Sequence, residues 1–394
     1  MKKVLFLLVM IIFLPNTVIV SAGEESEESE TDSAAYILVE DSTGTVLSES
    51  NADERLAPAS LTKIMVLLLA AEEINAGRLS LEEPVAVSAH ASQSDGSVIW
   101  LEPGEIMSVA DLFKAVIIAS ANDASVALAE HIAGTEDAFV KMMNQKAYVL
   151  GMTNTNFNNA AGFDHPDHYT SARDAATMSR AFMRADNYAL FSENMLTRLS
   201  SVRTGTERET QLLNTNKLIT YYNGIEGIKT GTTDNAGFCL SAAATRNEMR
   251  LISVVMGCKD NDGRVDLSEK LLDYGFGNYE LYRSFGNELE PLENLIIQGG
   301  VEHDLKVILA PVRVRENQSE PGIVIPKGRA KDIEYDIYLP ESVSAPISRN
   351  QPVGTVTAKL DGKVVYESYI TAAGNAYRLT FGRILSFLTR RFFI

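Results

Sequence analysis

An uninterrupted apolar run, Ile64 to Ala71, constrains the fold of this chain more than any other feature of its sequence. The run has no polar face, and a helix that is apolar on all sides must be enclosed by the rest of the protein. Pro58 before the run and Gly77 after it are residue types typical of helix beginnings and ends. The sequence therefore predicts a buried helix around which a globular domain is organised.

A hydroxyl and an amine lie at the start of this helix. Ser60 and Lys63 are three residues apart, which puts them on one helical face about one turn from each other. A serine hydroxyl becomes a strong nucleophile when a lysine held neutral by burial or by a neighbouring cation removes its proton. The alternative is structural, with the serine capping the helix and the lysine reaching water. The Ser-x-x-Lys spacing alone does not separate the two interpretations.

Composition and the N-terminus indicate an exported, acidic, globular protein. The 394 residues are 45% hydrophobic and 22% charged, and the chain is long enough for two domains. Residues 1–22 have the features of a secretory signal peptide, since two lysines precede an apolar run and small residues follow it. Residues 23–33 are rich in Glu and Ser and are expected to form a disordered tether. The net charge of −17, about −19 without the signal, argues against a nucleic-acid partner.

Two strand-like runs, residues 237–245 and 250–257, are joined by a short polar turn. One cysteine lies in the first run, and the other directly follows the second run. Cys239 and Cys258 could face each other across a hairpin. We expect buried free thiols, because a cross-strand disulfide is often strained and a shift of register by one residue separates the pair. A disulfide is the alternative in an exported protein.

A second patch of polar residues interrupts two apolar helices. Ser120 and Asn122 lie in a short break between helices predicted over residues 109–118 and 124–132. Polar side chains at such a break either cap the next helix or line a cleft.

A third patch combines Lys229, Thr230 and Gly231 in a predicted strand. A glycine in a strand allows another chain to lie close along its edge. The alternative is an exposed edge strand protected by its lysine.

The run from Asp164 to His168 contains two aspartates and two histidines, but it does not predict a metal site. Its spacing matches no common zinc motif, and a turn around Pro166 explains its composition. We expect neither a metal nor another cofactor.

The remaining pattern predicts a mixed domain followed by an all-β domain. Helices are expected over residues 137–150, 171–185 and 267–274, and a hairpin over 36–40 and 45–47. The all-β domain is expected over residues 285–374, since the signals in residues 305–372 are all of period two and Asp361-Gly362 is typical of a hairpin turn. Residues 375–394 form a basic amphipathic pattern, which predicts a helix lying on an anionic membrane surface. The alternative is a helix docked on the β domain.

The three polar patches together resemble the three motifs of penicillin-binding proteins and serine β-lactamases. Ser60-Leu61-Thr62-Lys63, Ser120-Ala121-Asn122 and Lys229-Thr230-Gly231 occur in that order, at intervals of 60 and 109 residues. The segments around them are similar to the low-molecular-mass D-alanyl-D-alanine carboxypeptidases: residues 58–65, 120–124, 227–231 with Ala236-Gly237, and 249–257. The resemblance extends from about Ala34 to the end of the chain.

The resemblance implies an α/β (α+β) fold. An antiparallel sheet flanked by helices is expected in residues 34–284, followed by a small all-β domain and an amphipathic helix. It also implies a location at the outer face of the bacterial cytoplasmic membrane. The implied substrates are peptidoglycan stem peptides, and the implied inhibitors are β-lactam antibiotics.

The resemblance also implies roles for the motif residues. Ser60 attacks the carbonyl between the two terminal D-alanines, and Lys63 takes its proton. Lys229 helps to hold Lys63 neutral, Ser120 relays the proton to the departing D-alanine, and Asn122 binds the substrate backbone. Water then hydrolyses the acyl-enzyme, whereas a β-lactam leaves Ser60 slowly.

Substrate binding is expected to involve the third motif and a nearby arginine. The backbone N–H groups of Ser60 and Thr232 would form the oxyanion hole. The residues expected to contact the substrate or its free carboxylate are Lys229, Thr230, Gly231, Thr232 and Arg264. Thr232 stands where relatives often carry a histidine or an aromatic residue, so we expect an altered rate or subsite preference rather than lost activity.

Three other functions compete with a carboxypeptidase. A serine β-lactamase needs a Glu-x-x-Leu-Asn run between the second and third motifs, and residues 209–213 are only a near match. A DD-endopeptidase would not need a cationic seat for a free carboxylate. A non-catalytic cell-wall scaffold would not need all three motifs.

Overall fold

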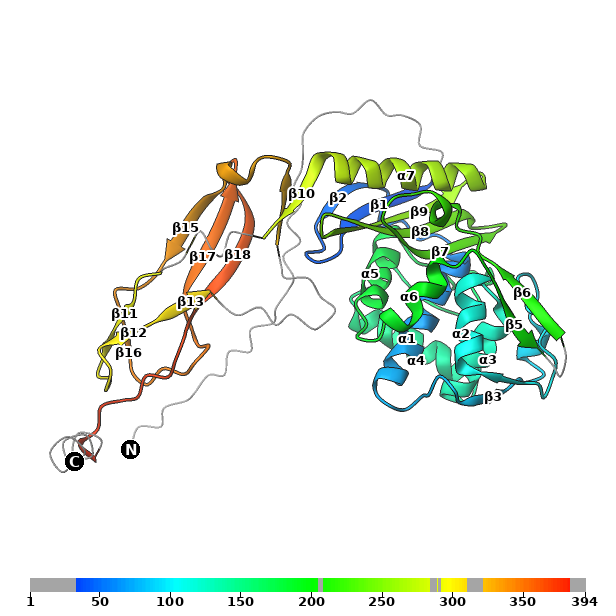
Figure 1. Ribbon diagram of the computed structural model, residues 1–394, viewed down its shortest axis with the longest axis horizontal. Coiled ribbons are helices and arrows are strands. Elements are labelled where there is room, and N and C mark those ends of the chain that lie inside the picture. The colour runs from blue at the N-terminus through cyan, green and yellow to red at the C-terminus, as the bar shows by residue number, and fades with distance from the viewer. Residues whose placement is uncertain (1–32, 205–207, 284–288, 290–291, 310–321, 383–394) are drawn as a thin grey trace.

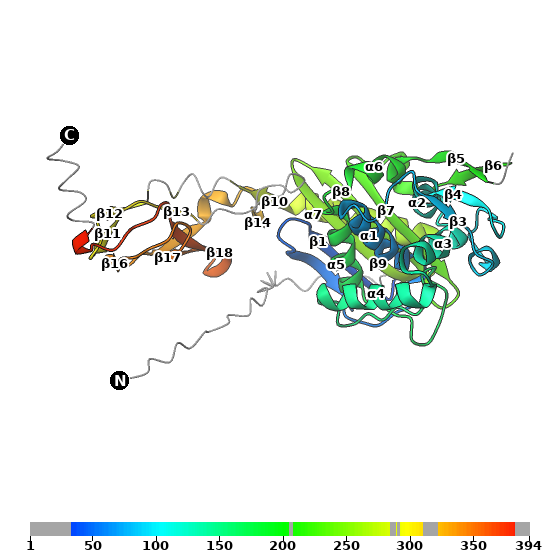
Figure 2. The ribbon, with the colours of Figure 1, turned by 90° about the horizontal axis from the view of Figure 1, so that it is seen from below.

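The computed structural model describes residues 33–204, 208–283, 289, 292–309 and 322–382. Figure 1 shows a large domain of helices packed on a sheet and, beside it, a slender domain of strands. Figure 2 shows that the two domains lie end to end. The expected fold class is confirmed, since the sheet of the large domain is antiparallel and the second domain is built from strands.

Five antiparallel strands form the sheet of the large domain, in the order β2-β1-β9-β8-β7. Among the described strands, β7 therefore lies at one edge, and this strand carries the third motif. The strands are β1 (Ala35–Glu40), β2 (Val46–Ser50), β7 (Ile225–Thr233), β8 (Gly237–Arg246) and β9 (Met249–Cys258).

Different helices cover the two faces of this sheet. In β9, Leu251 and Val255 pack in one apolar cluster with α7 (Asn261–Asn278), whereas Ile252 and Val254 pack in another cluster with the remaining helices. Alternate residues of a strand point to opposite faces, so a strand that is buried on both sides is apolar throughout. Figure 1 shows α7 lying along one face of the sheet and the helical lobe on the other.

The helical lobe surrounds α1, as its apolar sequence predicts. All residues of α1 from Thr62 to Ala71 are buried. The helices around it are α2 (Val109–Ile118), α3 (Asn122–Ala133), α4 (Glu136–Val149), α5 (Ala172–Met183) and α6 (Ala189–Leu196), and α1 itself is Thr62–Asn75. Two hairpins complete the lobe: β3 (Pro84–Ala86) with β4 (Ile106–Ser108), and β5 (Leu199–Thr204) with β6 (Arg208–Leu213).

The second domain contains one three-stranded and one four-stranded sheet. Asp361 and Gly362 join β17 to β18 with φ values of 52° and 74°, which is the tight hairpin turn predicted from the sequence. The strands are β11 (Leu295–Gln298), β12 (Asp304–Leu305), β13 (Val307–Leu309), β15 (Glu334–Tyr338), β16 (Ser342–Ser344), β17 (Pro352–Leu360) and β18 (Lys363–Ala372).

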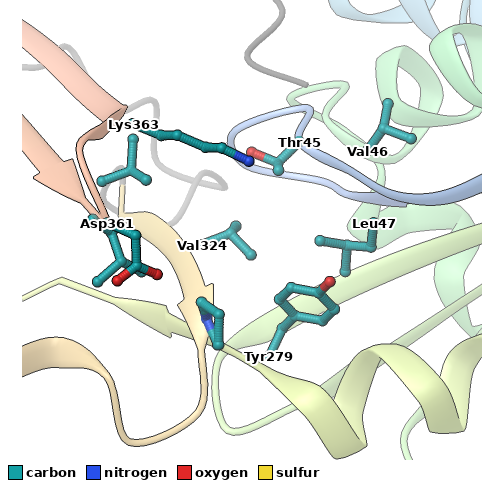
Figure 3. Close-up of a pocket in the computed structure, with 10 residues that line it drawn as sticks. Thr45, Val46, Leu47, Tyr279, Val324, Asp361 and Lys363 are labelled. Carbon is teal, nitrogen blue, oxygen red and sulfur yellow. The ribbon is translucent and has the colours of Figure 1, made fainter. Parts of the chain in front are cut away.

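The two domains are joined by strand pairing. After α7 the chain forms β10 (Tyr279–Tyr282), which pairs with β14 (Ile323–Pro326). A pocket of about 190 Å³ lies at this junction, and Figure 3 shows its walls. Leu47 comes from the large domain and Asp361 from the β17–β18 turn of the second domain, so both domains contribute to the pocket.

The structure corrects two expectations. The closing helix predicted over 267–274 is part of the longer α7, which begins after the N-cap Asp260. The helix contains three glycines, which weaken its helical sequence pattern. The predicted terminal helix does not begin at residue 375. Ala376 bridges to Ile347 and Arg378 bridges to Gly300, so residues 376–378 are extended along the β domain. Helical backbone is present only at residues 381–382 of the described part of this segment. Residues 383–394 of that prediction lie outside the described residues.

Both cysteines are buried and are not joined by a disulfide in the structure, as expected. In the sheet, Cys239 lies opposite Gly231 and Cys258 lies opposite Phe238. The two cysteines are therefore not directly opposite each other.

Candidate active site

The candidate nucleophile lies in a tight turn, and two glycines from distant parts of the chain pack against this turn. Ser60 is the middle residue of a 3-10 turn, Ala59–Leu61, directly before α1, and Ala59 has a φ of 47°. A Cβ on Gly162 would lie 2.0 Å from the Ala59 carbonyl oxygen, and a Cβ on Gly231 would lie 3.1 Å from the Ser60 nitrogen. The loop containing Gly162 and the edge strand β7 therefore pack directly against the turn, which a larger side chain would prevent.

Lys63 lies in the first turn of α1, and its amine is enclosed. Its Nζ lies 3.0 Å from Ser60 Oγ and 2.7 Å from the side-chain oxygen of Asn122, and it also donates to the Ala161 carbonyl. Burial, and then the nearby charge of Lys229, lowers the pKa of Lys63 well below its ordinary value. The arrangement favours a neutral amine that can accept the Ser60 proton.

The second motif lies where α2 ends and α3 begins. Ser120 lies in the break with a φ of 59°, and its buried Oγ has no hydrogen-bond partner among the described residues. An unpaired buried hydroxyl and a left-handed backbone both cost free energy, and such features cluster at functional sites. Asn122 is not in the break, because it is the first residue of α3. Its amide nitrogen donates to the Asp95 carbonyl at 2.6 Å while its oxygen accepts from Lys63.

Asp123, which the sequence analysis did not single out, holds the neighbouring loop. Its buried carboxylate accepts hydrogen bonds from the backbone nitrogens of Ile99 at 3.1 Å and Leu101 at 3.0 Å. Carboxylates that accept backbone N–H groups make strong, charge-assisted hydrogen bonds. The only sequence signal was its position directly after the second motif.

The third motif places a buried cation on the edge strand. Lys229 is 3% exposed, and its Nζ donates to the Thr230 carbonyl at 3.1 Å. Burial, and then the charge of Arg264, lowers the pKa of Lys229 to about 7. The hydroxyl of Thr230 is hydrogen-bonded to that of Thr215 at 2.5 Å, which fixes its rotamer. Lys229 is thus a weakly acidic ammonium near neutral pH.

Arg264 ties the first turn of α7 to the end of β7. Its Nη1 donates to the Gly231 carbonyl at 2.8 Å, the Cys239 carbonyl at 3.0 Å and Thr232 Oγ1 at 3.2 Å. Asn261 accepts from the other side of the guanidinium. Arg264 is 4% exposed, and its hydrogen bonds hold the guanidinium at the base of the third motif. Thr232 is exposed.

A family described as D-alanyl-D-alanine carboxypeptidase, peptidase S11, matches residues 22–260. The chain belongs to this family. A second match, described as the C-terminal domain of penicillin-binding protein 5, covers residues 318–377 of the carboxypeptidase. The protein is therefore a serine hydrolase of the D-alanyl-D-alanine carboxypeptidase family, as its motifs predicted.

Relatives align with almost the whole carboxypeptidase. D-alanyl-D-alanine carboxypeptidase DacF of Bacillus subtilis is 36% identical, over 97% of this chain and 95% of its own. DacC of Escherichia coli is 35% identical, over 94% of this chain and 91% of its own. The crystal structure of penicillin-binding protein 5 from Haemophilus influenzae matches with a TM-score of 0.77 and 30% identity, covering 88% of this chain and 98% of that one.

The near match to a β-lactamase motif does not lie in a catalytic arrangement. Glu209 is an exposed residue of β6, and its carboxylate accepts from Ser201 on the neighbouring strand β5. Within the described residues, no group of three His, Cys, Asp or Glu side chains could hold a metal ion. In the carboxypeptidase the Lys63 amine contacts Ser60 Oγ, and the Asn122 side-chain amide contacts that amine.

One buried residue near the nucleophile was not singled out from the sequence. His168 belongs to the run that suggested a turn, yet it is 2% exposed and its Nε2 lies 2.8 Å from the hydroxyl of Thr62. The two residues are 106 positions apart, so no local pattern could have linked them. The turn itself is confirmed, since the His168 nitrogen donates to the His165 carbonyl at 2.9 Å.

Proposed function

We propose that this chain removes the terminal D-alanine from peptidoglycan stem peptides through an acyl-enzyme on Ser60. The observation that carries the proposal is the 3.0 Å contact between Ser60 Oγ and the fully buried Lys63 amine. Lys63 takes the hydroxyl proton while Ser60 attacks the carbonyl between the two D-alanines. The peptide bond then breaks, the nitrogen of the departing D-alanine takes up a proton, and the remaining acyl group stays on Ser60.

Ser120 is the proposed route for that proton. Its Oγ is buried and lacks a partner among the described residues, so it is available to accept from Lys63 and to donate to the departing amine. Asn122 holds Lys63 in place through its side-chain oxygen. The contact of Asn122 with the substrate backbone stays a prediction, because both ends of its amide already have protein partners.

The backbone nitrogens of Ser60 and Thr232 are the proposed oxyanion hole. Close packing of Gly231 against the Ser60 nitrogen supports this proposal, since it brings β7 next to the nucleophile turn. An oxyanion-hole donor typically contributes about 3 to 4 kcal/mol to lowering the barrier. Water then attacks the acyl group and regenerates the Ser60 hydroxyl.

Lys229, Thr230 and Arg264 form the proposed seat for the free carboxylate of the substrate. Two cationic side chains at one end of β7 favour binding of an anion there. Arg264 is fully engaged with Gly231, Thr232 and Asn261, so it stabilises the seat through the shape of the strand as well as through its charge. An endopeptidase substrate, which lacks this carboxylate, would not benefit from the charge.

We further propose that the protein is exported and acts on the outer side of the cytoplasmic membrane. Support comes from the signal-like residues 1–22, and from the basic amphipathic pattern near the C-terminus. None of the helices in the described part of the chain could cross a bilayer. Binding of the purified full chain to vesicles with anionic lipids, compared with a chain ending at residue 382, tests the membrane proposal.

Penicillin labelling followed by mass spectrometry tests the catalytic proposal. We expect one penicilloyl adduct on the peptide containing Ser60 and none in the variant S60A. Release of D-alanine from a synthetic pentapeptide ending in D-Ala-D-Ala should accompany it. An adduct on another residue, or D-alanine release by S60A, would overturn the proposal.

A further inference from the structure

The buried imidazole of His168 lies between two parts of the active site. On one side its Nε2 lies 2.8 Å from Oγ1 of Thr62, which begins α1 and directly precedes Lys63. On the other side its Nδ1 accepts hydrogen bonds from the backbone nitrogens of Asn158 at 3.0 Å and Asn159 at 3.4 Å. The ring is also packed edge-on against Phe157.

These contacts determine which ring nitrogen carries the proton. Nδ1 faces two backbone N–H donors, so it must be the acceptor, and the single proton of the neutral ring is then on Nε2. Nε2–H therefore donates to the Thr62 hydroxyl. Burial lowers the pKa of His168 to about 4, so the ring is neutral at physiological pH.

The loop held by His168 supplies a ligand to the catalytic lysine. Residues 158–163 turn tightly, since the Asn159 side-chain oxygen accepts from the nitrogens of Gly162 at 2.7 Å and Phe163 at 2.9 Å. The Ala161 carbonyl at the centre of this turn accepts from Lys63 Nζ. The same loop packs Gly162 against the carbonyl of Ala59.

We propose that His168 is a positioning residue for the acylation step. Its neutral imidazole connects the start of α1 to the loop that presents the Ala161 carbonyl, and so fixes the Lys63 amine against Ser60. This inference rests on the proposed function of Ser60 and Lys63. A displacement of about 1 Å in a reacting group costs about 100-fold in rate, so loss of the connection should affect the rate of acylation more than the binding of the inhibitor.

Rapid-mixing acylation by penicillin tests the proposal. Thermal melts first establish the temperatures at which wild type, H168F and H168N are folded. For each protein we then measure the rate constant at saturating penicillin and, separately, the half-saturating concentration. Phenylalanine preserves the ring shape without either hydrogen bond, whereas the asparagine oxygen can replace Nδ1 as the acceptor for the loop. H131Q is the control, because His131 contacts Glu83 at 2.9 Å on the outer part of α3.

We expect H168F to lower the saturating rate constant about 10- to 100-fold with the half-saturating concentration changed by less than about twofold. H168N should recover most of the loss, and H131Q should match wild type. The proposal would be overturned by a folded H168F that has the wild-type rate constant, or by an H168F in which only the half-saturating concentration changes. It would also be overturned if H168N recovered none of the lost rate.

A second variant covers the case in which H168F does not fold. T62V preserves the shape of Thr62 but removes the hydroxyl that His168 contacts, and it should lower the saturating rate constant at least about threefold. A wild-type rate constant in T62V would overturn the inference. Absence of any wild-type adduct on Ser60 would instead overturn the proposed function, so the two failures are distinguishable.

Discussion

The side-chain oxygen of Asn122 accepts a hydrogen bond from the Lys63 amine at 2.7 Å. The first residue of α3 is thereby joined to the first turn of α1, although 59 positions separate the two residues. Because an amide carries no charge, this contact orients the lysine without stabilising its protonated form as strongly as a carboxylate would. The choice of an amide at this position therefore keeps the base available.

The variant N122D tests this interpretation. A carboxylate beside Lys63 should raise the pKa of the amine, so that it is protonated at neutral pH and acylation by penicillin falls about 100-fold. Part of the rate should return as the pH is raised above the new pKa. N223D, which adds the same charge at an exposed turn, should acylate like wild type. A pH-independent loss in N122D would contradict the electrostatic explanation.

Removing the charge of Lys229 should move the acid limb of the acylation profile to higher pH. The Lys229 ammonium contributes to the lowered pKa of Lys63, so K229Q should let that pKa rise and leave less neutral amine at pH 7. The pH dependence of penicillin acylation is the measurement. K217Q is a matched control, since Lys217 is exposed and pairs with Asp262. An unchanged limb in K229Q would show that burial alone sets the Lys63 pKa.

Ser120 should matter for rate and not for stability. Its buried hydroxyl has no partner among the described residues, so S120A removes an unsatisfied group and should change the free energy of unfolding by less than about 1 kcal/mol. Acylation should nevertheless fall about 100-fold or more. S125A is the opposite case, because Ser125 Oγ donates to the Ala160 carbonyl at 2.8 Å and its loss should cost about 1 to 3 kcal/mol. For both variants, urea unfolding measures the free energy of unfolding, and penicillin labelling measures the rate of acylation.

Two glycines with left-handed backbones allow the cost of backbone strain to be measured separately from the cost of a steric clash. Gly162 has a φ of 91° and an added Cβ would lie 2.0 Å from the Ala59 carbonyl oxygen, whereas Gly151 has a φ of 75° and open space around it. G151A should lower the free energy of unfolding by about 1 to 2 kcal/mol. G162A should cost at least about 2 kcal/mol more, because the nucleophile turn must move. Equal losses on urea unfolding would refute the close approach.

His168 should make stability depend on pH below neutrality. Burial, then the charges of His165 and Lys63, lowers its pKa from 6.5 to about 4, while Asp164 opposes the shift. Between these two values the unfolded chain binds a proton that the folded chain does not, so stability falls as the pH is lowered from 6.5 to about 4. The loss should reach about 3 kcal/mol.

The pH dependence of the free energy of unfolding, from urea titrations, checks this expectation. H168Q cannot titrate and should lack that part of the loss. The same slope in H168Q and wild type would assign the acid sensitivity to other groups.

Local patterns predicted many of the elements. The apolar run at Ile64 required enclosure on all sides, and α1 is buried from Thr62 to Ala71. A helix was predicted over residues 171–185, and the Oγ of Ser171 accepts from the Asp174 nitrogen at 3.2 Å at the start of α5. In each case a few neighbouring residues contain the complete physical reason for the element.

Elements without such a local reason were misplaced. Three glycines weaken the helical pattern of α7, yet it extends from Asn261 because Asp260 caps it and the sheet buries its apolar face. The segment after residue 375 has a helical pattern, but the backbone of Ala376 pairs with Ile347 instead. Tertiary contacts outweighed local propensity at both positions.

The sequence by itself determined the order of the chemical groups, the buried helix and the family, because motif spacing and apolar periodicity are properties of neighbouring residues. Only the tertiary structure decided that Lys63 contacts Ala161 and Asn122, and that Thr62 contacts His168. Those pairs lie between 59 and 106 positions apart. Their distances depend on how the sheet and helices pack, which sets both the burial of the amine and the availability of its lone pair.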